Sequence, residues 1–542
     1  MCGFIFSRND ENIDIANLLS SIKHRGPDST NHLKMKNIVC GFNRLAIVNN
    51  DENSEQPMVD NNKRYILLFN GELYNYKKIR RQLETDYKIK FKTTSDTEVV
   101  LNSLIIQGEK AVEEFDGIFS IVFTDLKKNE TLLIRDPFGV KPLYYFYDKD
   151  ILYASSEIKP LYKINNCSID PAGTLSTLSY GVSPSSSTLF KGIKKVLPGQ
   201  IVCFNDKISL SNYYAYTYNN NNCNNDDEIF EMISATVDEQ KPDIKYGVML
   251  SGGVDSTLLL ALTNNESNFS GTYSVNVDHP DMSEYKWQKS ANAQLNMIKN
   301  EKFIINTKND FSIDSLLKIA SLYDLPAIHP NYFGSYLLMK EASKDGLKVM
   351  ISGEGADEVF LGYKWFLQNE IEFNEFLQYA KYDNLTKIFD LKTIDEPFNI
   401  KSMDIEEVFQ KIYLQKWLTR QDLSGMANSI EVRVPFLGIK LATYINNLEF
   451  SNKTKNGSIS KYYLKKYLER FCSNDFIYRK KIGFDYPLND WIGEEHYNYL
   501  MDYSGDYNKN YITNIYNNRM NSYFNSRLIF VLVMYVAWLD SL

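Results

Sequence analysis

The sequence predicts two successive domains of different fold class: a layered α+β domain, then an α/β domain built on a parallel sheet. Up to about residue 210, short β-rich runs such as "RYILLFNGELY" and "IFSIVFTD" are separated by Gly, Asn and Asp, which is typical of strands joined by turns. Further along, single apolar strands are each followed by a helical segment, as in "KYGVML" and "DSTLLLALT". Strand, loop and helix units of this kind form parallel sheets with crossover helices.

A polar, asparagine-rich tract separates the two patterns. The stretch "YNNNNCNNDDE", residues 218–228, has too little apolar content to be buried, so we interpret it as part of a linker. We expect a first domain over residues 1–210, a linker over residues 211–228 and a second domain over residues 229–542. From about Glu370 onward the pattern predicts mainly helices.

The composition is that of a soluble globular protein. The chain has 542 residues, a net charge of -8 and no long basic block, so we expect neither a nucleic-acid partner nor an anionic membrane surface. The longest apolar stretch, "LIFVLVMYVAWL" at residues 528–539, is shorter than the roughly 20 residues that span a bilayer. We therefore expect a buried C-terminal helix and no membrane span.

The cysteines and histidines follow no metal or disulfide pattern. The six cysteines are scattered without a C-x-x-C pair, and the five histidines show no H-x-x-x-H spacing. This usage fits a reducing compartment, and we expect a cytoplasmic protein.

The first six residues, "MCGFIF", place Cys2 directly after the initiator methionine and before an apolar run. A secretory signal is excluded as an interpretation, because "SRNDENIDI" follows with no long apolar core or cleavage site. A small residue in a core strand explains the hexamer by itself. A nucleophile explains it too, because loss of Met1 would leave an α-amine, with a pKa of about 8, beside the thiol.

The loop "LSGGVDS", residues 250–256, lies between a predicted strand and a predicted helix. Gly252 and Gly253 allow backbone N–H groups to approach a phosphate, and the helix N-terminus adds partial positive charge. Asp255 is suited to hold a Mg²⁺ ion that neutralises the phosphate. The loop lacks the G-K-[ST] of a Walker motif, and taken alone it fits a plain glycine-rich turn equally well.

A second loop, "ISGEGADE" at residues 351–358, also follows a buried strand and also joins a Ser-Gly pair to carboxylates. In an open parallel sheet, loops at the carboxyl ends of neighbouring strands converge on one crevice. Asp255 and Asp357 could then share one magnesium ion. A helix N-terminus that favours acidic residues explains the charge, but it does not explain why the Ser-Gly pair occurs twice.

Together these features resemble the glutamine-dependent asparagine synthetase family of class B. The resemblance covers nearly the whole chain, through "MCGF", "KHRGPDS", "NRLAIV", "QPM", "FNGELYN", "SDTEV", "FDGIFS", "RDPFGVKPLYY", "ASSEIKPL", "LSGGVDS", "SGEGADEVF" and "NSIEVRVPFL". It implies an N-terminal-nucleophile glutaminase with αββα layers, fused to a doubly wound ATP pyrophosphatase domain with a helical C-terminal part. It also makes Cys2 the expected nucleophile.

For glutamine hydrolysis the resemblance assigns one role to each motif residue. Cys2 attacks the amide, while Asn70 and the backbone N–H of Gly71 form the oxyanion hole. Arg44 pairs with the substrate carboxylate, and the α-ammonium group is held by two acids, Glu72 and Asp96. The backbone that lines the pocket is implied to be Leu45, Ala46, Ile47 and Val48. The alternatives are a surface role for Arg44 and a turn role for Glu72.

For synthesis the resemblance implies an ATP site and an acyl-AMP intermediate, with Mg²⁺ on Asp255 and Asp357. Glu354 corresponds to the acid required for the acyl-adenylate, and Lys461 to the lysine that neutralises charge. The neighbouring Lys465 and Lys466 could correspond to that lysine instead, and a lysine in such a run is commonly a solvated surface residue. The expected nucleotide contacts are Leu250, Ser251, Gly252, Gly253, Asp255, Ser256, Val275, Ser352 and Gly353.

The resemblance implies glutamine, ATP and aspartate as substrates, passage of ammonia between the two sites, and allows a homodimer. Three motifs depart from the family pattern: "KHRGPD", where Lys23 keeps the charge, and "LGY" and "VPFLG", which contain Leu361 and Gly438. The last two leave the acceptor open between aspartate and another carboxylate, such as a uronic acid or a peptide side chain. A β-lactam synthetase fits less well because Cys2 is retained, and a non-catalytic sensor fits less well because Cys2 and the acids are intact.

Overall fold

The computed structural model describes residues 2–542 except for short internal segments. The segments outside the description are 48–53, 206, 218–220, 222–224, 298, 368–381, 390–404, 481–482, 484 and 506. Val48, which the sequence predicts to line the glutamine pocket, lies outside the described residues.

The N-terminal part contains two antiparallel sheets of six strands each, in the orders β10-β8-β9-β1-β3-β2 and β12-β11-β7-β6-β5-β4. The first sheet consists of β1 (Gly3–Arg8), β2 (Ser29–Met35), β3 (Ile38–Arg44), β8 (Tyr144–Asp148), β9 (Ile151–Ser155) and β10 (Ile193–Lys195). The second consists of β4 (Met58–Val59), β5 (Tyr65–Leu73), β6 (Gly117–Asp125), β7 (Glu130–Arg135), β11 (Gln200–Phe204) and β12 (Ile208–Asn212).

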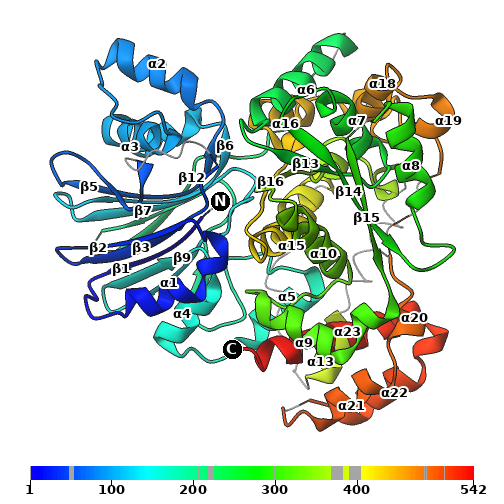
Figure 1. The fold of residues 1–542 in the computed structure, drawn as a ribbon. Helices are drawn as coiled ribbons and strands as arrows, with labels where there is room; N and C mark the ends of the chain where they lie inside the picture. Colours follow the sequence, from blue (N-terminus) through cyan, green and yellow to red (C-terminus); the bar gives the residue numbers. More distant parts are fainter. Residues whose placement is uncertain are drawn as a thin grey trace.

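The alternation of side chains along the strands explains the layering of this part. In β1, Phe4 and Phe6 pack into the core between the two sheets, whereas Ile5 points to the other face and packs with Leu19 and Ile22. Helices therefore cover both outer faces, and the predicted α+β domain with αββα layers is confirmed (Figure 1). The helices are α1 (Ile15–Ser21) and α4 (Ile158–Asn165) on the first sheet, α2 (Tyr76–Asp86) and α3 (Asp96–Gln107) on the second, and α5 (Pro171–Tyr180).

The C-terminal part is built on a parallel sheet of five strands in the order β15-β14-β13-β16-β17. The strands are β13 (Tyr246–Met249), β14 (Phe269–Val277), β15 (Asn300–Asn306), β16 (Val349–Ile351) and β17 (Glu431–Arg433). The chain first adds strands on one side of β13 and then on the other, so β13 and β16 flank the point where the order reverses. The predicted doubly wound fold is confirmed, and ligands bind at such a reversal point.

Helices lie on both sides of this sheet, with α6, α7 and α16 on one side and α10 and α15 on the other (Figure 1). The helices of this region are α6 (Asp226–Gln240), α7 (Val254–Thr263), α8 (Tyr285–Gln294), α9 (Ile313–Leu322), α10 (Asn331–Lys344), α11 (Ala356–Val359), α13 (Tyr382–Ile388), α14 (Ile405–Val408), α15 (Leu414–Met426), α16 (Ile439–Asn446), α17 (Phe450–Thr454), α18 (Tyr462–Leu468) and α19 (Asn474–Ile477).

The end of the chain is helical, as predicted, with α20 (Leu488–Trp491), α21 (Glu494–Asp502), α22 (Lys509–Asn517) and α23 (Tyr523–Leu539). The apolar run at residues 528–539 forms most of α23, and its side chains up to Trp538 are buried, which confirms the predicted C-terminal helix. Among the described residues, no helix is long and apolar enough to cross a membrane. Strand β17 was not predicted, because the sequence indicated mainly helices in this region.

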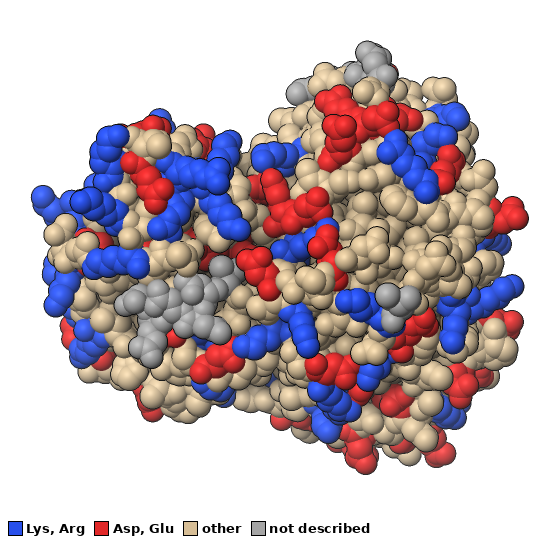
Figure 2. Space-filling view, turned by 45° about the horizontal axis from the view of Figure 1, so that its top comes forward, with Lys and Arg blue, Asp and Glu red and all other residues tan. Residues whose placement is uncertain are grey.

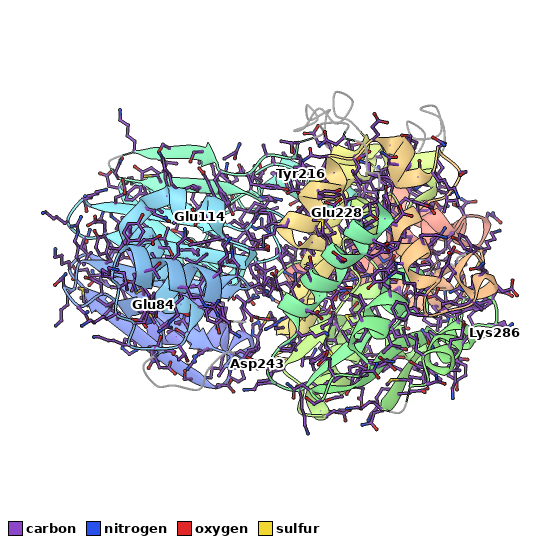
Figure 3. The ribbon with its side chains drawn as sticks, turned by 90° about the horizontal axis from the view of Figure 1, so that it is seen from above. Glu84, Glu114, Tyr216, Glu228, Asp243 and Lys286 are labelled. Atoms are coloured by element: carbon purple, nitrogen blue, oxygen red, sulfur yellow. The ribbon has the colours of Figure 1, made fainter. Side chains whose placement is uncertain are left out.

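The expected linker, residues 211–228, covers the connection between β12, which ends at Asn212, and α6, which begins at Asp226, and it overlaps both elements at its ends. Figure 3 shows the two parts of the chain side by side, with Tyr216 and Asp243 near their junction and Glu84 on the N-terminal part. Both signs of charge are interspersed on the face in Figure 2, which is hollowed between the two lobes.

Candidate functional sites

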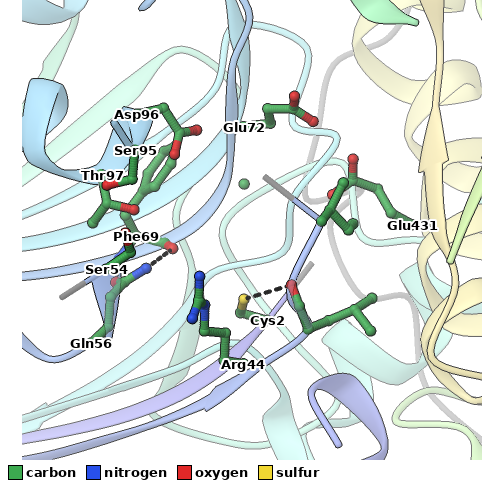
Figure 4. A pocket seen from close by; sticks show the side chains of 13 residues that line it. Cys2, Arg44, Ser54, Gln56, Phe69, Glu72, Ser95, Asp96, Thr97 and Glu431 are labelled. Carbon is green, nitrogen blue, oxygen red and sulfur yellow. Dashed lines mark hydrogen bonds between the residues drawn. The ribbon is translucent and has the colours of Figure 1, made fainter. Parts of the chain in front are cut away.

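A pocket opens around Cys2 at the ends of β1 and β5 (Figure 4). Most of its walls come from the N-terminal part, but one wall comes from the C-terminal sheet. The lining residues are Cys2, Arg44, Leu45, Ile47, Ser54, Gln56, Phe69, Gly71, Glu72, Ser95, Asp96, Thr97 and Glu431. The pocket thus contains most of the residues predicted to bind glutamine.

Cys2 lies at the start of β1 with its thiol buried, and burial raises the pKa of that thiol. The backbone nitrogen of Cys2 donates a hydrogen bond of 2.9 Å to Oδ1 of Asn70. Once Met1 is removed, this nitrogen is the α-amine. Asn70 would then hold the α-amine next to the thiol, and the α-amine is the group that must take the proton of that thiol.

Asn70 and Gly71 lie in β5 beside Cys2, as predicted. The Nδ2 group of Asn70, which is the expected oxyanion donor, is 3.4 Å from Oγ of Ser120. Gly71 leaves no room for a side chain, because a Cβ atom there would lie 2.0 Å from the carbonyl oxygen of Ile118. This close approach allows the backbone at position 71 to border the pocket.

Arg44 ends β3 and is largely buried, and its Nη1 atom lies 2.9 Å from Oε1 of Glu55. Glu55 was not predicted from the sequence as a partner of Arg44. An incoming substrate carboxylate must therefore compete with Glu55 for the guanidinium group. Leu45 and Ile47 line the pocket as predicted, whereas Ala46 is not among its lining residues, and its N–H donates to Asp28 at 2.7 Å.

The two acids predicted to hold the α-ammonium group differ in their partners. Asp96 begins α3 and accepts a hydrogen bond of 3.1 Å from the N–H of Leu73, and burial raises its pKa to about 6. Glu72 is paired with Arg433 of β17. Burial raises the pKa of Glu72, and the guanidinium of Arg433 opposes that shift.

Glu431 is a pocket residue that the sequence analysis quoted only as part of the motif "NSIEVRVPFL". Its Oε1 atom is 2.9 Å from Nε of Arg433, which also donates through Nη1 to the carbonyl of Gln240 at 2.8 Å. Arg433 thus joins two acids of the pocket, Glu72 and Glu431. The C-terminal sheet completes the pocket of the N-terminal part.

The loop that follows β13 is organised by its serines and glycines. Oγ of Ser251 lies 3.0 Å from Oγ of Ser256 and accepts from the N–H of Gly253 at 3.2 Å. Gly252 has a φ of 73°, and a Cβ atom there would lie 2.7 Å from the backbone nitrogen of Gln288. Only glycine fits this left-handed position without strain.

The loop that follows β16 touches the first loop, as predicted. A Cβ atom on Gly353 would lie 3.1 Å from Cβ of Asp255. Asp255 and Asp357 converge on one cation, because Nζ of Lys461 lies 2.5 Å from Oδ2 of Asp255 and 2.6 Å from Oδ1 of Asp357. Two carboxylates that converge from separate loops suit a hard divalent cation, so this pair fits Mg²⁺.

The structure distinguishes Lys461 from the two neighbouring lysines. Lys461 precedes α18 with a φ of 54°, and its side chain reaches both loops. Lys465 donates instead to Ser460, and the exposed Lys466 pairs with Glu469 at the surface. Gly362 makes room for this contact, because a Cβ atom there would lie 2.0 Å from Cε of Lys461.

The remaining predicted residues lie in the loops after β13 and β16 or in the neighbouring strand β14. Glu354 follows β16 and is paired with Arg420 of α15, while Gln421 donates to its Oε1 atom at 3.0 Å. Neither partner on α15 was predicted from the sequence. Val275 lies near the end of β14, and Leu250, directly after β13, is buried with its N–H bonded to Tyr273.

Two of the three departures from the family pattern, Leu361 and Gly438, have structural partners of their own. Leu361 is fully buried against Phe366 and Phe409 although its φ is 54°. Gly438 lies against Thr236 of α6, and the following N–H, of Ile439, donates to Asp116 of the N-terminal part at 3.4 Å.

The fold and the two sites define a class of protein in which an amidotransferase domain with an N-terminal cysteine is joined to a nucleotide-binding α/β domain. Two family models match the chain: a glutamine amidotransferase domain over residues 1–214 and asparagine synthase over residues 229–529. The chain belongs to the asparagine synthase family.

Curated relatives match along most of this chain. It is 29% identical to asparagine synthetase [glutamine-hydrolyzing] 1 of Bacillus subtilis, over 91% of this chain and 88% of the relative. It is 26% identical to asparagine synthetase B [glutamine-hydrolyzing] of Escherichia coli, over 87% of this chain and 78% of the relative. Among solved structures, a glutamine phosphoribosylpyrophosphate amidotransferase from B. subtilis matches 46% of this chain and 61% of its own, with 16% identity and a TM-score of 0.30.

Proposed function

We propose that this chain is a glutamine-hydrolysing asparagine synthetase, which uses ATP to convert aspartate to asparagine. The observation that carries the proposal is that one chain of this family holds two separate sites. Cys2 is held next to Asn70 in one of them, and Asp255, Asp357 and Lys461 meet between two Ser-Gly loops in the other.

In the first site, the thiol of Cys2 gives its proton to the α-amine and attacks the side-chain amide carbon of glutamine. The N–H of Gly71 and the amide of Asn70 would stabilise the developing oxyanion. Collapse of the tetrahedral intermediate passes the proton to the leaving nitrogen and releases ammonia. Water then hydrolyses the thioester to give glutamate and free thiol.

In the second site, an oxygen of the aspartate side-chain carboxylate attacks the α-phosphorus of ATP, and pyrophosphate leaves. Ammonia then attacks the carbonyl carbon of the acyl-AMP, and AMP leaves. Lys461 would place a positive charge against the phosphates, and the loop N–H groups and serines would bind them. Asp255 and Asp357 would hold Mg²⁺, which when bound neutralises charge on the departing pyrophosphate.

The five described cysteines are all free, namely Cys2, Cys40, Cys167, Cys203 and Cys472. Free thiols persist in reducing compartments, which supports the proposal of a cytoplasmic location.

Substitution of Cys2 tests the division of labour. We expect C2A to lose hydrolysis of glutamine and to keep synthesis of asparagine from aspartate, ATP and ammonium, because the second site is separate. Measurement of glutamate and asparagine under both nitrogen sources checks this. Equal loss of both activities in C2A would contradict the proposal.

Substitution of Asp255 tests the nucleotide site. We expect D255N to lose release of pyrophosphate with either nitrogen source, while hydrolysis of glutamine by Cys2 continues. Direct Mg²⁺ binding, measured by calorimetry in the presence of a non-hydrolysable ATP analogue, should weaken in D255N. Normal pyrophosphate release by this variant would rule out the metal assignment.

A further inference from the structure

Helix α15 carries a cationic side chain, Arg420, that contacts the loop with Glu354. Arg420 is paired with Glu354, and the adjacent Gln421 donates to the same carboxylate at 3.0 Å. The Nε atom of Arg420 is buried and has no hydrogen-bond partner among the described residues. Part of this guanidinium group therefore remains available to a ligand next to the nucleotide loops.

Lys416 lies one turn before Arg420 on the same helix and is only 6% exposed. Its Nζ atom lies over aromatic rings, 4.4 Å from the ring centroid of Trp417 and 5.5 Å from that of Tyr413. Among the described residues, the contacts of this ammonium group are these rings, and no hydrogen bond contributes to its pKa. A cation–π contact offsets only part of the cost of burying a charge, which a carboxylate partner would offset more fully.

The surroundings of Lys416 are more cationic than anionic. Burial lowers the pKa of Lys416, and the guanidinium groups of Arg527 and Arg420 lower it further, while only the carboxylate of Asp485 raises it. The Nε atom of Arg527, on α23, is also buried without a hydrogen-bond partner among the described residues. We call Lys416, Arg420, Arg527 and Asp485 the α15 charge cluster.

The charges of this cluster match a small molecule with two carboxylates and one amine. Residues four apart on a helix lie about 5–6 Å from each other at Cβ, so Lys416 and Arg420 can contact two different carboxylates of one ligand. If the ligand had only one carboxylate, placed beside Glu354, Lys416 and Arg527 would remain buried without an anionic partner. An ammonium group on the ligand would find its partner in Asp485.

We propose that the α15 charge cluster binds the acceptor as an α-amino dicarboxylic acid. Lys416 and Arg527 bind the α-carboxylate, Asp485 binds the α-ammonium, and Arg420 faces the side-chain carboxylate that reacts with ATP. This assignment rests on the proposed function. A uronic acid has one carboxylate and no amine, so it would leave the Lys416 end of the cluster unpaired.

The test uses the full chain with ammonium as the nitrogen source, and it follows AMP formation from ATP. We expect K416M to raise KM for aspartate roughly 10- to 100-fold, as for loss of a hydrogen bond to a charged group, and to leave KM for ATP unchanged. K416R should restore most of the affinity. The matched control is K411M, because Lys411 lies just before α15 but pairs at the surface with Glu407.

Two aspartate analogues separate a binding role from a structural one. β-Alanine lacks the α-carboxylate, so its inhibition constant against aspartate should be the same in K416M and in the unmodified chain. Succinate lacks the amine, so its inhibition constant should be unchanged in D485N, whereas aspartate should bind more weakly to that variant. The comparison of each analogue with aspartate within one variant remains informative even if that variant folds poorly.

The outcomes distinguish this assignment from the proposed function. If the unmodified chain forms no AMP with aspartate and ammonium, the proposed function fails. If it does form AMP, but K416M and D485N keep the normal KM for aspartate, or weaken both analogues as much as aspartate, the cluster does not bind the acceptor.

Discussion

Arg25 and Asp422 form a bidentate ion pair between the N-terminal part and α15, with Nη1 to Oδ2 at 2.9 Å and Nη2 to Oδ1 at 3.1 Å. The Arg25 side chain is fully buried, and it also contacts Glu157 at 3.2 Å and the carbonyl of Cys2 at 3.1 Å. Arg25 thus joins Asp422 of the C-terminal part to the backbone of Cys2, which lies directly before β1.

We expect R25M to destabilise the protein by about 3–5 kcal/mol, because it leaves Asp422 as a buried carboxylate without its cation and takes one of two partners from Glu157, which keeps His24. The loss is measured by urea unfolding of R25M and of the unmodified chain. K34M is the control, since Lys34 pairs with Glu11 on the surface and should change stability by at most about 0.5 kcal/mol. A loss in R25M as small as that in K34M would show that the pair contributes little.

Lys195 predicts a pH dependence of stability. Burial, together with the nearby Arg135, lowers its pKa to about 7. Between about pH 7 and 10 the unfolded chain therefore holds a proton that the folded chain has lost, and this group makes stability rise with pH in that window.

The comparison needs K195M and the neighbouring, exposed K194M. Between pH 7 and 9.5 the unmodified chain should gain about 1–3 kcal/mol relative to K195M, from roughly 1.4 kcal/mol per pKa unit reduced by partial solvation. The difference between the unmodified chain and K194M should not change with pH. A constant difference for K195M as well would show that Lys195 is not the group responsible.

Leu361 predicts an unusual order of stability among its variants. Its φ of 54° penalises any side chain by about 1–2 kcal/mol, but its own side chain is fully buried. L361A and L361G should both be less stable than the unmodified chain by about 2–4 kcal/mol, and L361G should be the more stable of the two. The buried Leu464 of α18 is the control, because in a helix the glycine variant should be the less stable.

Gly438 and Thr236 predict a coupled pair. A Cβ atom at position 438 would lie 2.3 Å from Cγ2 of Thr236, so G438A should destabilise the protein. T236S removes that methyl group and keeps the hydroxyl, which donates to the carbonyl of Met232 at 2.8 Å. In the double variant most of the loss should disappear, with a coupling energy of about 0.5–3 kcal/mol in thermal unfolding. Additive losses would mean that the contact is easily relieved.

Much of the fold could be predicted from the sequence, because the signals for it are local. Alternating strands before residue 210 and strand-helix units after the Asn-rich tract indicated both fold classes. The proximity of the two Ser-Gly loops could also be predicted, since both loops follow strands of one parallel sheet. Strand β17 was missed because three residues inside a largely helical region are too short for a periodic signal.

The partners of the site residues could not be predicted in the same way. Glu55 on Arg44 and Arg420 on Glu354 come from parts of the chain whose spacing to the site carries no pattern. The choice of Lys461 over its neighbours also needed the structure, because a one-residue difference in register decides which lysine of a turn faces the loops.

The sequence by itself determined the two domain classes and the meeting of the two Ser-Gly loops, since each depends on residues close together in the chain, whereas Cys2 as the nucleophile stays a prediction from the resemblance. The tertiary structure decided how the sites are completed: Glu431 and Arg433 of the C-terminal sheet close the Cys2 pocket, and α15 supplies the charges around Glu354. These contacts arise only when surfaces far apart in sequence pack together, and the charges that become buried there must find partners in whatever surface they meet.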